Sequence, residues 1–237
     1  MIYGHHVGSG LSVAHNATDP SREGEAHVSL VAVDRQLAAL WPTSVRLYRP
    51  RTVLFQQGDR VEYVYLLIRG TIKFSFVYGS GHEVISLMRS DACALGADAA
   101  LLGVPSLVAA TTLCQCKIRS IPAEPIRKML RNDADLSFHM SRLMAFESLN
   151  HTMAIINSSS GNARDRLINF LRQQQAGVGK ASDAAPASAT ILRKHEIAKL
   201  LAITPEHLSR IVKRLAMEGI VEDHHKTIAL RRPNTIP

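Results

Sequence analysis

Three side chains near the C-terminal end of the chain have the chemistry to read DNA bases together. Glu206, Ser209 and Arg210 stand at positions i, i+3 and i+4, which project from one side of an α-helix. Arg210 can hold guanine through O6 and N7, Glu206 can accept from a cytosine amine, and Ser209 can meet a base edge or a phosphate. The spacing predicts a helix that enters the major groove of a duplex.

The preceding residues predict a first helix that supports this one. Ile197, Leu200 and Leu201 recur at i, i+3 and i+4, so residues 195–202 have one apolar face. Two features depart from the usual pattern of such a motif: Leu192 stands where a Ser or Thr cap is common, and Ala202 stands where the turn often has glycine. Each departure should cost about 1 kcal/mol of local stability without changing the role of the motif.

The second helix should be capped by Thr204 and carry Pro205 in its first turn. Its apolar positions point to one side, and its other side is polar and mostly basic, as a recognition helix requires. After Gly219, residues 220–221 and 227–230 can pair as a wing. We predict that eight residues contact DNA: Thr204, Glu206, His207, Ser209, Arg210, Lys213, Arg214 and Lys226.

An isolated basic amphipathic helix is more often a solvated surface helix, but helix, turn, helix and hairpin in this order favour DNA binding. The charge agrees with this interpretation. The chain of 237 residues has net charge +8, and residues 161–237 hold 13 Lys and Arg against 7 Asp and Glu. This excess of positive charge favours a polyanionic partner.

Other function classes find little support in the sequence. No apolar run approaches the ~20 residues of a membrane span and no segment resembles a secretion signal, so we expect a cytoplasmic protein without a membrane partner. Three cysteines do not make a disulfide framework. We find no Walker loop, nucleophile elbow, HExxH or paired-cysteine metal spacing, so we expect no enzymatic activity.

The chain divides into four parts by its patterning, which predicts an α+β fold. Residues 1–32 lack periodicity and should form a flexible extension, although a short helix could begin at residue 33. Residues 33–123 contain short β segments separated by turns and predict a small antiparallel β-barrel or jelly roll. Residues 124–158 read as one long helix, and residues 159–237 hold the winged helix-turn-helix.

The long helix should form a dimer seam. Six of its residues recur every three or four positions: Leu136, Met140, Leu143, Phe146, Asn150 and Met153. A stripe of this length after a complete barrel favours packing against the same helix of a second copy, with Asn150 fixing the register. The alternative is a helix that packs wholly on its own barrel.

The chain resembles the CRP/FNR superfamily of bacterial transcription regulators over about residues 35–232. The matching motifs are Val53-Leu54-Phe55-Gln56-Gln57-Gly58-Asp59, Tyr65-Leu66-Leu67-Ile68-Arg69-Gly70-Thr71-Ile72-Lys73, Thr204-Pro205-Glu206-His207-Leu208-Ser209-Arg210-Ile211 and Lys226-Thr227-Ile228. The resemblance implies a cyclic-nucleotide-binding-like jelly roll, a dimerisation helix and a winged helix-turn-helix. It implies a homodimer that regulates transcription from double-stranded DNA, with RNA polymerase as a further partner of an activator.

The Glu206-x-x-Ser209-Arg210 spacing looks like the FNR type. Pro205-Glu206 is similar to the dissimilatory nitrate respiration regulators, which sense nitric oxide through haem. This resemblance implies a two-fold half-site like TTGA…TCAA.

The effector is open. At the places where nucleotide-binding members carry a glutamate and an arginine, this chain has Ala97 and Leu107, so the resemblance argues against cyclic AMP. No cysteine precedes Cys93, which argues against an iron-sulfur cluster. Haem, another small ligand, redox chemistry and no effector at all remain, the last being a DNA-binding protein whose barrel only dimerises. A candidate effector pocket comprises Gly96, Ala97, Leu107, His151 and Thr152.

Overall fold

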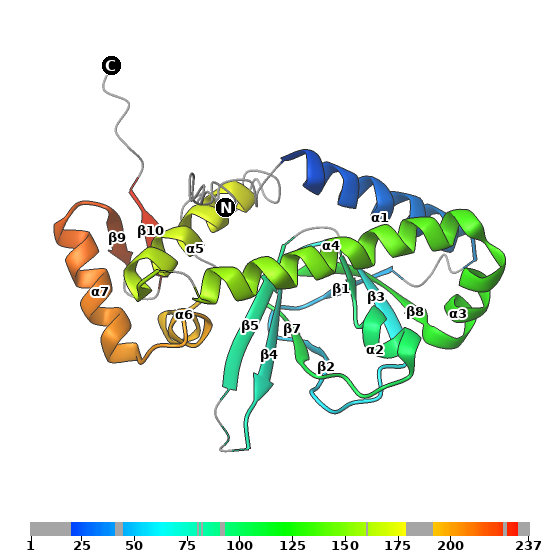
Figure 1. Cartoon of the computed structure of the whole chain (residues 1–237), viewed down its shortest axis with the longest axis horizontal. Helices are drawn as coiled ribbons and strands as arrows, with labels where there is room; N and C mark the ends of the chain where they lie inside the picture. Colours follow the sequence, from blue (N-terminus) through cyan, green and yellow to red (C-terminus); the bar gives the residue numbers. More distant parts are fainter. Residues whose placement is uncertain are drawn as a thin grey trace, which may run out of the picture.

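The computed structural model describes residues 20–40, 45–79, 81, 83–90, 93–159, 161–178, 192–224 and 227–231. A long helix, α4, starts beside α3, runs across a central β-domain and ends at a second body that lies at the other end of the molecule from α3 (Figure 1). We call that second body the C-terminal unit; it holds α5, α6, α7 and the hairpin β9–β10. No helix among the described residues is long and apolar enough to cross a membrane.

The β-domain is a sandwich of two antiparallel four-stranded sheets, which agrees with the expected jelly roll. One sheet has the order β1-β8-β3-β6 and the other β2-β7-β4-β5. The strands are β1 (Val45–Tyr48), β2 (Val53–Phe55), β3 (Tyr63–Arg69), β4 (Ile72–Val77), β5 (Glu83–Arg89), β6 (Cys93–Leu95), β7 (Ala109–Thr112) and β8 (Cys116–Pro122). The strands β1 and β6 and the helix α2 (Ala97–Leu102) were not expected, because each is too short to show a period.

The sheet β1-β8-β3-β6 buries apolar side chains on both of its faces. In its register, Val64 on β3 lies opposite Ile121 on β8, and Leu67 lies opposite Ile118; since the two pairs are three positions apart, they point to opposite faces. All four side chains are fully buried. Burying such a side chain stabilises the fold by about 1.5–3 kcal/mol.

The predicted flexible extension over residues 1–32 is wrong from residue 20 onward, where α1 (Pro20–Leu40) begins. Leu30, Val33 and Leu37 are at most 2% exposed and pack in the core of the β-domain. Asp34 accepts a hydrogen bond of 2.5 Å from Arg119 Nε on β8. The apolar stripe is narrow, so the sequence predicts only a short helix from residue 33, which is the second part of α1. Residues 1–19 lie outside the described residues.

The single helix expected over residues 124–158 is two helices, α3 (Ala123–Asn132) and α4 (Ala134–Ser159). Asp133 separates them with an extended backbone. Its Oδ1 accepts a hydrogen bond of 2.8 Å from the backbone N–H of Leu136. Asp133 thus caps α4 as an N-terminal Asp commonly does, which is why the chain can restart a helix there.

The predicted dimer seam is wrong for its first three residues. Leu136, Met140 and Leu143 are 0%, 3% and 0% exposed and belong to the core of the protomer's own β-domain. A second copy cannot reach them. Phe146, Asn150 and Met153 are half-buried.

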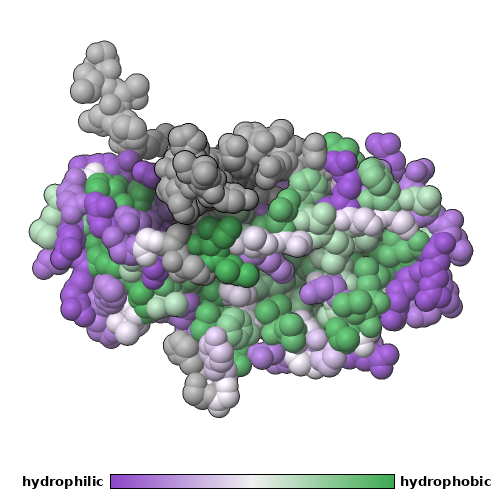
Figure 2. All heavy atoms as spheres, in the orientation of Figure 1, coloured by the Kyte–Doolittle hydropathy of each residue, from purple (hydrophilic) through white to green (hydrophobic). Residues whose placement is uncertain are grey.

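A different stripe of α4 is left uncovered on the opposite side. Its members are half-buried or exposed and are spaced alternately by four and three: Phe138, Arg142, Ala145, Leu149, Thr152 and Ile156. We call them the outer stripe. In Figure 2, apolar and weakly polar side chains form a band along α4 between two hydrophilic ends. The helix therefore has apolar residues on two faces. The sequence prediction picked out the inward face and overlooked the outward one.

The C-terminal unit has its own core. Leu167 and Leu171 of α5 (Ala163–Val178) pack with buried residues of α6 (Lys194–Leu200) and α7 (Pro205–Met217). The hairpin of β9 (Val221–His224) and β10 (Thr227–Leu230) closes it through Val221 and Ile228. The expected order of helix, turn, helix and wing is confirmed.

Candidate nucleic-acid interface

The helix α7 has the two-faced structure that the sequence predicted. Its N-cap is Thr204, whose Oγ1 accepts from the backbone N–H of His207 at 3.2 Å, and Pro205 occupies the first turn. Leu208, Val212 and Leu215 are buried beneath it. This packing fixes which side of α7 faces solvent.

The outward side of α7 carries most of the residues predicted to bind DNA. Seven of the eight are exposed and lie on α7 or at its cap: Thr204, Glu206, His207, Ser209, Arg210, Lys213 and Arg214. The eighth, Lys226, lies outside the described residues. At the end of the molecule where α7 lies, the surface is strongly hydrophilic (Figures 1 and 2).

The hydrogen-bonding state of these side chains suits base contacts. Arg210 and Lys213 are both exposed, and neither forms an ion pair within 4.0 Å with a residue in the described parts of the chain. Hydrogen bonds from its own backbone N–H and from the Thr204 hydroxyl lower the pKa of Glu206, so it is an ionised acceptor at neutral pH. Ser209 donates to the carbonyl of Pro205 at 2.9 Å, which leaves its oxygen able to accept.

The turn between α6 and α7 is strained at one residue. Ala202 has φ 52°, in the left-handed region that favours glycine. Arg166 on α5 donates from Nη2 to the carbonyl of Leu201 at 3.2 Å and holds the turn in place. The alanine at this position, where the motif often has glycine, therefore strains the backbone of the turn.

The start of α6 differs from the expected cap at Leu192. Leu192 is fully buried, and the helix is capped one residue later at Arg193. The backbone N–H of Arg193 donates to Glu196 Oε2 at 3.0 Å, so Glu196 supplies half of a capping box. The wing is joined to the same helix by an ion pair between Lys194 and Asp223.

The candidate effector residues do not line one enclosed site. Gly96 and Ala97 are buried at the start of α2; Gly96 has φ 67°, and a Cβ there would come within 3.0 Å of Phe55 and Val61. Leu107 is 85% exposed. His151 and Thr152 are exposed on α4.

A charged pair joins the β-domain to α4 in this region. Arg89 at the end of β5 lies with Nη2 3.3 Å from Glu147 Oε1 on α4, and the two side chains are 11% and 14% exposed. Burial raises the pKa of Glu147, although the positive charges of Arg89 and His151 oppose this. Sequence reasoning missed the pair, because its members are 58 positions apart and belong to no motif.

His151, the one histidine among the candidate effector residues, is exposed, and no group of three His, Cys, Asp or Glu side chains in the described ranges is placed to hold a metal ion.

Comparison with known proteins agrees with this two-part architecture. Residues 45–133 match the cyclic nucleotide-binding domain, and residues 165–235 match the Crp-like helix-turn-helix domain. The chain is 25% identical over 211 residues to the global nitrogen regulator of a Nostoc species, covering 88% of this chain and 95% of that protein. It is 24% identical to the regulatory protein HlyX of Actinobacillus pleuropneumoniae, covering 76% and 75% of the two chains.

Among solved structures, the chain is similar to CLP, the c-di-GMP responsive global regulator of Xanthomonas campestris. The TM-score is 0.71 with 17% identity, covering 86% of this chain and 100% of CLP. At this identity the likeness supports the fold.

A cyclic nucleotide-binding domain followed by a Crp-like helix-turn-helix defines a class of DNA-binding transcription regulators. The chain belongs to the CRP/FNR family of that class. The identities to a nitrogen regulator and to HlyX differ by only a percentage point, so they do not distinguish the FNR type from other branches.

Proposed function

We propose that the chain acts as a homodimeric, sequence-specific DNA-binding regulator that reads a palindrome with two copies of α7. The observation that carries this is the outward face of α7, where Glu206, Ser209 and Arg210 are exposed together. A helix held from behind by an apolar core and open on its polar side is the arrangement used in the major groove.

The outer stripe of α4 supports the dimer. Phe138, Leu149 and Ile156 are 58%, 50% and 42% exposed, which is unusual for large apolar side chains at regular spacing. Alternating steps of four and three residues are the repeat of a two-stranded coiled coil. A second copy of the same helix covers such a stripe with two-fold symmetry, and two-fold symmetry in the protein matches a palindrome in the DNA.

The half-site proposed is of the TTGA type, with TCAA on the other side. The support is chemical: Arg210 for a guanine and Glu206 for a cytosine on the partner strand, one turn apart on the same face. RNA polymerase is the further partner if bound protein activates transcription.

The direct test is selection of bound duplexes from a random pool by the full chain, followed by titration of the enriched sequence against a scrambled duplex. We expect a palindrome bound at least about a thousandfold more tightly than the scrambled control at physiological salt. Equal binding of both duplexes would refute sequence-specific recognition.

A second candidate is the effector-independent form of the same function, in which the β-domain serves as a dimerisation scaffold. The Arg89–Glu147 pair supports it, because it connects β5 to α4 directly without a ligand. The competing proposal is a haem or another small effector. Mass spectrometry and an absorption spectrum of the protein as isolated separate the two. A band near about 400 nm, where bound haem absorbs, or a ligand-dependent change in DNA affinity would overturn effector independence.

A further inference from the structure

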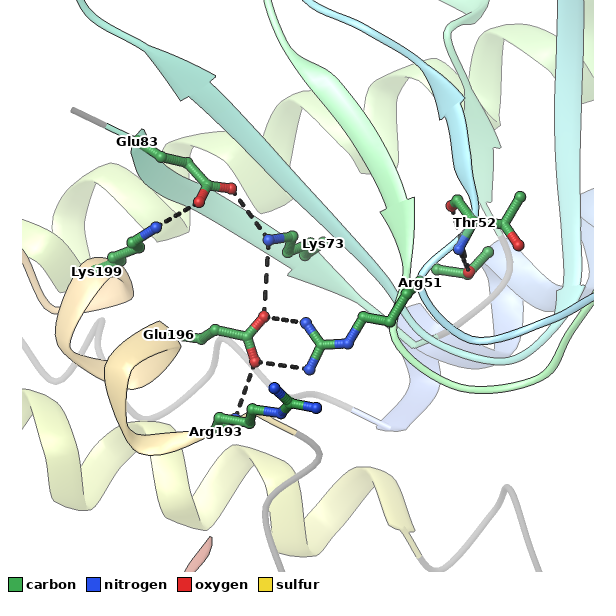
Figure 3. Close-up of polar contacts among 8 residues, drawn as sticks. Arg51, Thr52, Lys73, Glu83, Arg193, Glu196 and Lys199 are labelled. Carbon is green, nitrogen blue, oxygen red and sulfur yellow. Dashed lines mark hydrogen bonds and ion pairs between the residues drawn. The ribbon is translucent and has the colours of Figure 1, made fainter. Parts of the chain in front are cut away.

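We infer that five charged residues at the junction of the β-domain and the C-terminal unit are positioning residues for DNA binding. They are Arg51, Lys73, Glu83, Glu196 and Lys199, and we call them the charge cluster (Figure 3). They fix the orientation of the C-terminal unit and so set the direction in which α7 is presented. This inference rests on the proposed recognition of a palindrome by a dimer.

The charge cluster alternates in sign across the junction. Glu196 on α6 is held by Arg51 through both carboxylate oxygens, one at 3.1 Å from Nη2, and its side chain is only 3% exposed. Lys73 on β4 lies 3.7 Å from Glu196 and 3.0 Å from Glu83 on β5. Glu83 also accepts from Lys199 on α6 at 2.5 Å. Glu196 of α6 is therefore bound by two cations of the β-domain, and Glu83 of the β-domain is bound by one cation from each side of the junction.

The position of Arg51 is itself strongly constrained. It lies before β2 with φ 67°, a backbone conformation that costs about 1 kcal/mol or more for a residue with a side chain. Its backbone N–H donates to the carbonyl of Thr112 at 2.7 Å, and the Thr112 hydroxyl donates to the carbonyl of Arg49 at 2.7 Å. The turn thus aims the guanidinium at Glu196.

Apolar contacts accompany the ionic ones. Leu113, directly after β7, is 7% exposed and packs in the core of the C-terminal unit, and Met88 of β5 packs against that core. Together these contacts favour one orientation of the C-terminal unit on the β-domain. Any other orientation would separate buried charges from their partners, which is costly.

This orientation is competent for DNA binding. The members of the charge cluster in the C-terminal unit, Glu196 and Lys199, belong to α6, and the outward side of α7 stays exposed. The charge cluster therefore does not mask the recognition surface. Two rigidly oriented units engage two half-sites together, whereas loosely held units lose effective concentration at the second half-site.

The test titrates the full chain against two duplexes. One duplex carries the whole palindrome, and the other carries a single half-site. Glu196→Gln keeps an acceptor for the cap at Arg193 but removes the charge that Arg51 and Lys73 bind. Plain electrostatics predicts tighter DNA binding, since the variant is more positive. A positioning role predicts the opposite: palindrome affinity about five- to tenfold weaker, and half-site affinity within about twofold of wild type.

Arg51→Asn makes the same test from the β-domain. Asn tolerates the left-handed backbone, so the turn should fold. The matched control is Arg49→Asn, which removes an equal charge from an exposed residue two positions away. We expect the palindrome-specific loss for Arg51→Asn and not for Arg49→Asn.

Unchanged or tighter palindrome binding by Glu196→Gln overturns the inference, as does an equal loss on both duplexes by Arg51→Asn. A wild-type protein that prefers neither duplex over random DNA instead refutes the proposed function, so the two failures are distinguishable.

Discussion

Arg210 and Lys213 are both exposed cations on α7, yet they offer a duplex different contacts. The planar guanidinium can bind a guanine edge with two hydrogen bonds, while the ammonium acts as a point charge on phosphate. We predict that Arg210→Ala loses about 1–3 kcal/mol of discrimination at one base pair, while Lys213→Ala weakens binding to all sequences alike. Titration against a panel of single-substituted operators measures both. If the Arg210→Ala protein kept the wild-type sequence preference, Arg210 would not be a residue that reads a base.

Ala202 is a second residue whose local chemistry gives a prediction. It is exposed and left-handed at φ 52°, so its methyl group strains the turn without adding packing. Ala202→Gly should raise the free energy of unfolding by about 0.5–1 kcal/mol, measured by urea titration. Ala216→Gly, a control within α7, should lower it by about 1 kcal/mol. A loss of stability in Ala202→Gly would contradict the strain.

At the scale of elements, α4 carries two apolar faces with separate roles. The inner face buries Leu143 in its own β-domain, and the outer stripe presents Leu149 at 50% exposure. We predict that Leu149→Asp yields a folded monomer, because an unpaired carboxylate cannot be buried in a seam. Sedimentation velocity with circular dichroism gives both properties at once.

Two variants set the limits of that experiment. Leu102→Asp makes the same change at a 76% exposed leucine on α2 and should leave the dimer intact. Leu143→Asp should unfold the β-domain instead of dissociating two folded chains, since Leu143 has no exposed surface. A fully dimeric Leu149→Asp protein would place the seam elsewhere.

The elements that the sequence predicted well have either a clear period or clear boundaries. The helix α7 repeats its apolar positions at helical spacing, and the strands β3, β4 and β5 are separated by turn residues such as Gly70 and Gly79. The helix α4 misled because both of its apolar faces have helical spacing, and spacing alone does not say which face the β-domain covers. The helix α1 was expected only from residue 33, because the large apolar side chains that it buries among residues 28–39 are few: Leu30, Val33 and Leu37.

At the scale of the whole molecule, the junction is sensitive to pH. Burial on its own would raise the pKa of Glu83, but hydrogen bonds from Lys199 and Lys73 outweigh it and lower the pKa from 4.5 to about 2. The folded state therefore prefers the carboxylate. Its contribution to stability is complete above pH 4.5 and is lost as the pH falls from there toward 2.

We predict that Glu83→Gln lowers the free energy of unfolding on the order of 1–2 kcal/mol at about pH 6, after allowance for solvent screening. The difference from wild type should shrink to less than half by about pH 3. Urea titrations at a series of pH values measure it. The control is Glu124→Gln, because Glu124 is 63% exposed in its surface pairs on α3 and should show little difference at any pH. A Glu83→Gln difference that is constant with pH would show that the carboxylate charge does not stabilise the junction.

The sequence could not reveal this junction. Arg51 and Glu196 are 145 positions apart, and no motif or periodic pattern contains both of them. The exposure of seven of the eight predicted DNA-contact residues could be inferred, because they occupy one helix and its cap, where spacing determines direction. Contacts between distant segments depend on how two finished cores meet, and local spacing carries no information about that.

The shared position of Leu113 bears on how such a protein can be recombined. Leu113 is encoded with the β-domain but fills space in the core behind α7. A graft that moves only the last third of the chain onto a foreign sensing half will leave a vacancy there unless the new host supplies an equivalent leucine; losing one from a packed interior commonly costs about 2–5 kcal/mol. The stability of a transplanted C-terminal unit thus depends on a side chain that lies far outside the segment that an engineer would choose to cut.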